Sequence, residues 1–127
     1  MAYDRNNVFA RILRGELPCT KVYEDEHVLA FRDINPQAPT HIVLIPKGEY
    51  ASVDDFAEKA SEAEQAAFVR AIGRIAHSEG VAAGGYRILS NHGEAAHQEV
   101  AHFHLHLFAG RDLGPMLCRP GRSSADP

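Results

Sequence analysis

The sequence predicts an α+β domain built around one antiparallel sheet of about five strands, with one long and one short helix. The run His102–Phe108 alternates polar and apolar residues with the period of two that is typical of a strand. The polar pair Asp25-Glu26 separates two short apolar runs, as the turn of a hairpin does. Residues 61–79 instead carry apolar residues at helical spacing. Together these features predict the α+β class.

Length and composition are those of a single globular domain. The chain has 127 residues, of which 45% are hydrophobic and 24% are charged. Its formal net charge is −4 and it has no basic patch, which argues against nucleic acid as a partner. A small phosphate-bearing substrate remains compatible with this charge, because a local cluster of donors matters more than the net value.

Both ends of the chain are expected to be flexible tails, over residues 1–6 and 119–127. The first six residues lack the apolar core of a signal peptide, and no window approaches the length of a membrane span. Cys19 and Cys118 lie far apart in the sequence, which suggests free thiols in a reducing compartment. We therefore expect a cytoplasmic protein with no membrane partner.

The first half of the chain is predicted to form a short helix and three strands. Asn7 can cap a helix over residues 7–14, and Gly15 can end it. The strands are predicted over residues 20–24, 28–32 and 42–45. A proline-punctuated loop, 33–39, precedes the third strand, which ends at Pro46.

The second half is predicted to form the long helix and two more strands. Ser61 and Glu64 have the spacing of a capping box, which opens a helix that runs to about Glu79 and ends before Gly80. One apolar stripe of this helix contains Phe68, Ile72, Ile75 and Ala76. Two strands are predicted after it, over residues 86–91 and 102–108, with the loop 92–101 between them and Gly110 as the stop.

Three histidines lie in strict alternation near the C-terminus. His102, His104 and His106 share one face of the predicted strand, whereas the residues between them are apolar and face the opposite side. Histidine is a mediocre core residue and gains little from exposure, so a row of three calls for an explanation. We considered a solvated histidine-rich face, a metal site, and catalysis on a phosphate.

A metal site is limited by the reach of the strand. His102 and His106 lie roughly 13 Å apart along an extended strand, at about 3.3 Å per residue. Zinc ligands must lie about 2.0–2.1 Å from the ion, so the strand supplies at most two ligands, and a residue such as His41 would have to complete the set. Imidazoles suit phosphate chemistry because they offer a nucleophilic nitrogen, hydrogen-bond donors and a proton carrier near neutral pH.

Two segments carry a resemblance to a known family. His-Phe-His-Leu-His-Leu-Phe, at 102–108, fits the His-φ-His-φ-His-φ-φ signature of the histidine-triad (HIT) superfamily of nucleotide hydrolases and transferases. The rest of the chain is similar to its Hint branch, the nucleoside phosphoramidases, and the segment Phe31–His41 is the second anchor of the resemblance. The similarity extends from about Asn7 to Leu117. It implies a single HIT domain over 1–127 and a homodimer with a continuous sheet.

The resemblance also implies a two-step reaction. His104 would attack the α-phosphorus of a purine nucleoside 5′-phosphoramidate, such as an AMP-amine, and expel the amine. Water would then hydrolyse the nucleotidyl-histidine. His102 and His106 would neutralise phosphoryl oxygens, with His41 as a supporting residue. No metal or other cofactor is expected, because Asn7 and Ala10 replace the zinc-binding Cys-x-x-Cys of some relatives.

A nucleotide pocket is implied by the same resemblance. Asp33 is expected to accept both ribose hydroxyls, because an ionised carboxylate has several acceptor sites. Glu99 and His97 depart from the Ser and Gly that are usual in the phosphoramidase branch. The resemblance therefore does not determine which leaving group the reaction releases. The residues expected to contact substrate are Val8, Phe9, Ile12, Phe31, Asp33, Ile34, Val43, Asn91, Gln98 and Glu99.

Other functions remain open from the sequence alone. A dinucleoside polyphosphate hydrolase would share the nucleophile but release a nucleotide. A nucleotide-binding or scaffold protein would have the pocket without significant turnover, and a zinc protein would use two strand histidines with His41. The sequence determines neither the base, the amine released nor the biological role.

Overall fold

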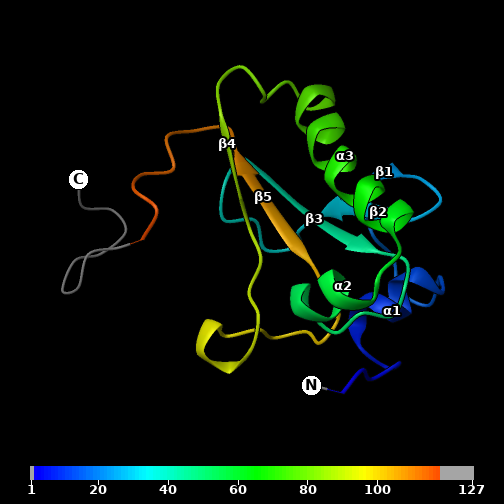
Figure 1. Cartoon of the computed structure of the whole chain (residues 1–127). Helices are drawn as coiled ribbons and strands as arrows, with labels where there is room; N and C mark the ends of the chain where they lie inside the picture. Colours follow the sequence, from blue (N-terminus) through cyan, green and yellow to red (C-terminus); the bar gives the residue numbers. More distant parts are fainter. Residues whose placement is uncertain (1, 118–127) are drawn as a thin grey trace.

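The computed structural model describes residues 2–117 and has one antiparallel sheet (Figure 1). Its strands are β1 Lys21–Glu24, β2 Val28–Arg32, β3 Thr40–Pro46, β4 Tyr86–Leu89 and β5 Leu105–Ala109. Their order across the sheet is β1-β2-β3-β5-β4, and every neighbouring pair is antiparallel. The predicted five-stranded antiparallel sheet is confirmed.

The helices are α1 Val8–Leu13, α2 Val53–Lys59 and α3 Glu62–Ser78, with a short 3₁₀ helix, η1, at Glu94–Ala96. The sequence predicts α1 and α3 but neither α2 nor η1. Helix α2 has charges suited to a helix, Asp54 and Asp55 in its first turn and Lys59 in its last. Phe56 is its one buried residue, so it lacks the apolar periodicity on which the prediction depended.

The predicted helix starts are both confirmed. Asn7 caps α1, because its side chain accepts from the backbone N–H of Ala10 at 2.9 Å. At α3 the Ser61 hydroxyl accepts from the N–H of Glu64, and the Glu64 carboxylate accepts from the N–H of Ser61, each at 3.1 Å. This reciprocal pair is the capping box that the sequence predicts.

Several strand boundaries differ from the prediction, including the start of β1 at Lys21 instead of Thr20. β3 is longer than residues 42–45, and β4 ends at Leu89 instead of Asn91. β5 begins at Leu105, not at His102, so two of the three histidines precede the strand. The reason is that the backbone of Phe103 donates to Tyr50 O, at 2.7 Å, and not to the neighbouring strand.

The two faces of the sheet are covered unequally. On one face, α2 and α3 enclose the main core, in which the rings of Phe68 and Phe103 have centroids 4.8 Å apart. On the other face, the buried residues Leu29, Phe31, Val43 and Ile45 pack against three partly buried apolar residues of α1, Phe9, Ile12 and Leu13. Helix α1 has six residues and α3 has seventeen, so the second face has the smaller helical cover.

The end of β5 has a steric requirement. Gly110 follows the strand directly with φ of +99°, a conformation that residues with a Cβ rarely adopt. A Cβ at this position would also lie 2.8 Å from Cβ of Pro39. The stop that the sequence predicts at Gly110 therefore depends on close packing against the loop that precedes β3.

The N-terminal segment is attached to the domain although residues 1–6 are expected to be flexible. The Tyr3 hydroxyl lies 2.7 Å from Nδ1 of His102, and Arg5 forms an ion pair with Glu49 at 3.1 Å. Cys19 is an exposed free thiol. The predictions for Cys118 and residues 119–127 lie outside the described residues. Within residues 2–117 no helix is both long and apolar enough to cross a bilayer.

Candidate active site

His104 is fixed in one tautomer by the backbone. Its ring Nδ1 lies 2.8 Å from the carbonyl oxygen of His102. A carbonyl oxygen only accepts, so Nδ1 carries the proton and Nε2 keeps a free lone pair. The side chain is 7% exposed, and burial lowers its pKa from the ordinary histidine value. His104 is therefore neutral at pH 7 and has a nucleophilic nitrogen.

The surroundings of His104 hold both its backbone and its ring. Ser90, which follows β4, donates its hydroxyl to the carbonyl oxygen of His104 at 2.7 Å. Phe9 of α1 packs edge-on against the imidazole, with ring centroids 4.9 Å apart and planes at 69°. The predicted pocket wall and the central histidine are thus in direct contact.

His102 has both ring nitrogens occupied by protein groups. Nε2 lies 2.9 Å from the carbonyl oxygen of Pro46, so it must donate. Nδ1 is then an acceptor, and it receives the Tyr3 hydroxyl at 2.7 Å. The residue is fully buried, which lowers its pKa. The resemblance implied that His102 neutralises phosphoryl oxygens, whereas this arrangement leaves no free nitrogen to do so.

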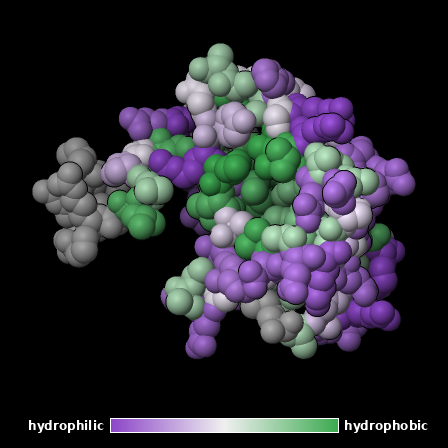
Figure 2. All heavy atoms as spheres, in the orientation of Figure 1, coloured by the Kyte–Doolittle hydropathy of each residue, from purple (hydrophilic) through white to green (hydrophobic). Residues whose placement is uncertain are grey.

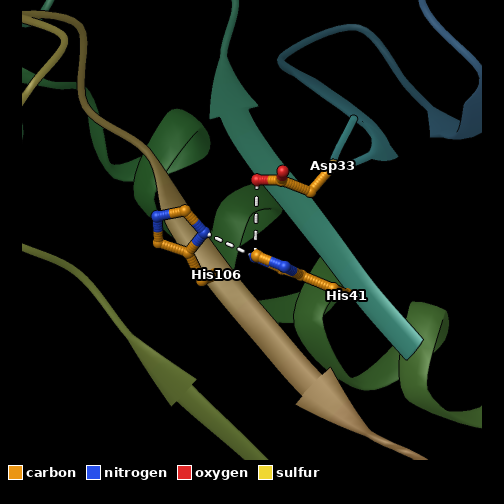
Figure 3. A group of neighbouring side chains, drawn as sticks. All are labelled: Asp33, His41 and His106. Carbon is orange, nitrogen blue, oxygen red and sulfur yellow. Dashed lines mark hydrogen bonds and ion pairs between the residues drawn. The ribbon is translucent and has the colours of Figure 1, made fainter. Parts of the chain in front are cut away.

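His106 and His41 form a second pair, with Asp33 beside them (Figure 3). The backbone N–H of Gln37 lies 3.1 Å from Nδ1 of His41 and donates to it, so the His41 proton is on Nε2. That Nε2 lies 2.9 Å from Nδ1 of His106 and donates to it. The His106 proton is therefore on Nε2, the ring edge that points away from His41.

The neighbouring histidines thus have opposite tautomers. His104 has a lone pair on Nε2, and His106 has a proton on Nε2, with ring centroids 5.2 Å apart and planes at 81°. Burial lowers the pKa of His106 to about 4, and so does repulsion from His104 and His41 when these rings are protonated. Burial also lowers the pKa of His41 and outweighs the opposing effect of Asp33, 3.5 Å away. At neutral pH the site provides one nucleophile and one adjacent N–H donor.

Asp33, His41 and His106 are also the residues to test as a metal site. Their candidate ligand atoms lie within 4.8 Å of one another. Two nitrogens bound to one tetrahedral zinc lie about 3.3 Å apart, at zinc–nitrogen distances of about 2.0–2.1 Å. The nitrogens of His41 and His106 are closer, at 2.9 Å, and share a proton. The observed geometry is that of a hydrogen bond, and the rings would have to separate to hold zinc.

Phe9, Phe31 and Val43, three of the predicted pocket residues, lie on the same face of the sheet as His106. Phe31, Val43 and His106 are paired neighbours across β2, β3 and β5. The ring of Phe9 lies 5.7 Å from that of Phe31 and so joins α1 to this row. Two other predicted pocket residues reach solvent, with Val8 41% exposed and Ile34, next to Asp33 in the chain, 90% exposed. Exposed apolar side chains beside a carboxylate fit a base and a ribose.

The Asp33 carboxylate already forms a hydrogen bond within its own loop. One carboxylate oxygen accepts from the backbone N–H of Asn35 at 2.8 Å, and the other faces His41. Each carboxylate oxygen has two lone pairs, so acceptor capacity remains for a ribose. The loop thereby fixes the orientation of the carboxylate before any ligand binds.

The side-chain amide of Gln98 forms hydrogen bonds that hold the loop between β4 and β5, so it does not point into solvent. Its Nε2 donates to the carbonyls of Ala51 and Val100, at 2.8 and 2.9 Å, and its Oε1 accepts from Gly93 N at 3.0 Å. This amide shapes the loop that precedes the triad. The hydroxyl of Ser52 and Nδ1 of His92, 2.7 Å apart, form a further tie to the same segment.

Two unusual residues of this loop remain exposed. His97 has φ of +59°, in the left-handed region that favours glycine, the residue that the resemblance leads us to expect at this position. The charge of Glu99 raises the pKa of His104 and so opposes the effect of burial. The Glu99 carboxylate therefore lies within electrostatic range of the nucleophile.

Ser90 and Tyr3 support the triad and were not found from the sequence. Ser90 lies within a predicted strand, where its polar side chain gives no special signal. Tyr3 lies 99 residues before His102 in a segment expected to be flexible. Asn91 follows Ser90 directly, and its expected contact with substrate stays a prediction.

Comparisons with known proteins cover nearly the whole chain. Residues 14–113 match the HIT domain family. An uncharacterized 13.2 kDa HIT-like protein of Azospirillum brasilense is 65% identical over 117 residues, 92% of this chain and 96% of that protein. The purine nucleoside phosphoramidase of Escherichia coli K12 is 46% identical over 116 residues, 90% of this chain and 95% of that protein. The solved structure of a HIT family hydrolase from Clostridium thermocellum has a TM-score of 0.82 and 42% identity, over 91% of this chain and 99% of that one.

Proposed function

The chain belongs to the HIT domain family of hydrolases, and we propose that it hydrolyses purine nucleoside 5′-phosphoramidates through a nucleotidyl-histidine intermediate. The observation that carries this proposal is the pair of opposite tautomers at His104 and His106. A nucleotide-binding protein without turnover has no need for a buried neutral nucleophile beside an N–H donor. The phosphoramidase from Escherichia coli supports the choice of substrate class.

In the first step, Nε2 of His104 forms a bond to the α-phosphorus and the phosphorus–nitrogen bond of the substrate breaks. The amine departs after accepting one proton, which is taken up from solvent. The proton on Nδ1 of His104 stays in place, held by the carbonyl of His102 at 2.8 Å. The phosphorylated ring is then a cation that neutralises one phosphoryl charge. Because one phosphorus–nitrogen bond replaces another, the step is nearly balanced in energy.

In the second step, water attacks the phosphorus and the bond to His104 breaks. The products are the nucleoside monophosphate, neutral His104 and two protons released at neutral pH. His106 contributes through its Nε2–H, which can stabilise phosphoryl oxygens during both steps. Phosphoryl transfer depends mainly on positioning and charge stabilisation, which a rigid pair of imidazoles provides.

The nucleotide is proposed to lie on the face covered by α1. Phe9, Phe31 and Val43 would contact the base, and Asp33 would accept the ribose hydroxyls. The apolar contacts of Phe9 with both Phe31 and His104 support this position, since they link the base site to the nucleophile.

A substrate panel tests the proposal. Adenosine phosphoramidate, guanosine phosphoramidate and diadenosine polyphosphates are compared at equal concentration, and kcat/KM is measured for each. We expect the phosphoramidates to be preferred by at least about tenfold, equivalent to about 1.4 kcal/mol in the transition state. A preference for the polyphosphates would identify the other branch of the family, and no turnover of any substrate would favour a binding protein.

We also propose a homodimer that extends the sheet. β4 is an edge strand, and its outer side has no partner strand within residues 2–117. Within β4, Ile88 and Leu89 are 44% and 38% exposed. Figure 2 shows an apolar area on the face of the molecule that contains the sheet. Exposed apolar edge strands favour pairing with a second chain. Sedimentation equilibrium tests this proposal, and Ile88→Lys should shift the protein towards monomer.

A further inference from the structure

The N-terminal segment places a tyrosine against the triad from outside the sheet. Asp4 O accepts from the backbone and side chain of Asn7, at 3.1 and 2.7 Å. The carbonyl of Arg5 accepts from the Arg14 guanidinium at 2.6 Å, and its side chain pairs with Glu49 at 3.1 Å. These contacts hold the segment independently of the tyrosine that precedes them. Removing only the Tyr3 hydroxyl should therefore leave the segment in place.

The Tyr3 hydroxyl completes the hydrogen bonding of His102. Nε2 of His102 must donate to the Pro46 carbonyl, so its Nδ1 needs a donor, and the Tyr3 O–H provides one at 2.7 Å. The two rings are also in contact, with centroids 5.5 Å apart. Burial raises the pKa of Tyr3, which keeps the hydroxyl protonated and able to donate. His102 is 0% exposed, so no water can replace this donor without rearrangement.

The bond matters for catalysis because His102 also orients His104. The ring of His102 is attached at both nitrogens, and its own carbonyl accepts Nδ1–H of His104 at 2.8 Å. A ring that has lost one of these hydrogen bonds can tilt. The backbone carbonyl of the same residue can then rotate away from Nδ1 of His104. His104 would lose the single tautomer that keeps its lone pair on Nε2.

We propose that Tyr3 is a positioning residue for the nucleophile, acting through His102 to fix the tautomer and direction of His104. The hydrogen bonds run from the Tyr3 hydroxyl to His102, and from His104 to the His102 carbonyl. This inference assigns a role to a residue outside the triad and its pocket. The kinetic part of its test rests on the proposed function, whereas the spectroscopic part does not.

The test compares Tyr3→Phe with Tyr23→Phe. The control is matched, because the Tyr23 hydroxyl also donates one hydrogen bond, to Asp25 at 2.6 Å, but it does so away from the triad. The imidazole ¹H–¹⁵N spectra of the free proteins report the tautomers directly. In the wild type and in Tyr23→Phe we expect His102 protonated at Nε2 and His104 at Nδ1. In Tyr3→Phe the Nδ1 signal of His102 should shift and His104 should show a mixture of tautomers.

The kinetic readout is the separation of kcat from KM with adenosine phosphoramidate. Tyr3→Phe should lower kcat about three- to tenfold, the effect of losing one neutral hydrogen bond, with KM changed less than about twofold. Tyr23→Phe should leave both constants unchanged. A His104 spectrum identical to wild type in Tyr3→Phe overturns the proposal, whatever happens to kcat or the melting temperature. If the wild type hydrolyses no phosphoramidate, the proposed function fails while the spectra still test the positioning role.

Discussion

The two ends of the histidine row are built differently. His102 and His104 lie before β5, are almost fully buried, and hydrogen-bond to carbonyl groups of the backbone. His106 lies within β5, is half-buried, and hydrogen-bonds to the side chain of His41. The first end is fixed by backbone carbonyls, which do not change protonation, and by the Tyr3 hydroxyl, whose pKa burial raises. The second is fixed by another titratable ring with a carboxylate beside it.

This difference separates the roles of chemically identical residues. A carbonyl forces a proton onto Nδ1 of His104 and frees Nε2 as a nucleophile. A protonated nitrogen of His41 forces the opposite tautomer on His106 and makes Nε2 a donor. The sequence spacing is the same at both ends, so the roles come from the partners and not from the histidines themselves.

The largest expected effect is at the nucleophile. His104→Ala should lower turnover by more than about 10³-fold, because no other described side chain offers a lone pair at that position. AMP binding should remain largely intact, since the pocket is built mostly from other residues. Single-turnover kinetics and calorimetry measure the two quantities. Turnover within tenfold of wild type would contradict the assignment of His104.

A smaller loss of turnover is expected at the donor end of the row, where His106 provides the N–H group. His106→Ala removes one N–H and should reduce kcat about 10²-fold, the lower range for a positioned proton donor. The nucleotidyl-enzyme should still form, because Nε2 of His104 retains its lone pair. Rapid-quench detection of the nucleotidylated protein distinguishes the role of His104 from that of His106. Complete loss of the intermediate would show that the roles are not separate.

The buried histidines should make folding stability depend on pH. Their folded pKa values lie below the ordinary value of about 6.5, so the unfolded state binds more protons as the pH falls. The stability is fully present above about pH 6.5 and is lost as the pH falls towards the folded pKa of His106, about 4. The shift at His106 corresponds to at most about 3 kcal/mol of this loss, at 1.36 kcal/mol per pKa unit, and part of it is shared with His104 and His41.

Urea unfolding at pH 7.5, 6 and 5 measures this dependence. His106→Gln is the comparison, because glutamine does not titrate in this range. The stability difference between wild type and variant should decrease as the pH falls. Parallel curves would mean that His106 is not buried in its neutral form.

Asp33 tests whether the donor end also binds the ribose. Asp33→Asn turns one acceptor oxygen into a donor, so AMP affinity should fall about tenfold, or about 1.4 kcal/mol. Affinity for 2′-deoxy-AMP should fall much less, because this ligand has already lost part of the interaction. Calorimetry with two proteins and two ligands gives the coupling energy. A coupling of zero would leave Asp33 with a role only in its loop and beside His41.

The smallest effect is expected from chelation. Activity should be unchanged in EDTA. Nε2 of His41 and Nδ1 of His106 are hydrogen-bonded at 2.9 Å, which is closer than two nitrogens bound to one zinc ion. The control is enzyme dialysed against EDTA and then supplied with zinc. Loss of activity on chelation and recovery with zinc would show that the donor end is a metal site.

The sequence by itself determined the architecture and the chemical inventory. Period-two alternation, the Asp25-Glu26 turn and the capping box at Ser61 are local signals, so they predicted the sheet and the long helix. The spacing of the histidines, with the segment Phe31–His41, indicated the family. These features depend on residues close in the chain, whose geometry the backbone largely fixes.

Only the tertiary structure decided what each histidine does. The start of β5 depends on Phe103 donating to Tyr50, and α2 depends on one buried phenylalanine. Tautomers depend on partners far away in sequence: the Pro46 carbonyl for His102, and His41 for His106. Hydrogen bonds across 56 and 65 residues leave no periodic trace in the sequence, because they arise only when the sheet and loops have packed. Local sequence therefore specified three similar imidazoles, and long-range packing made them different.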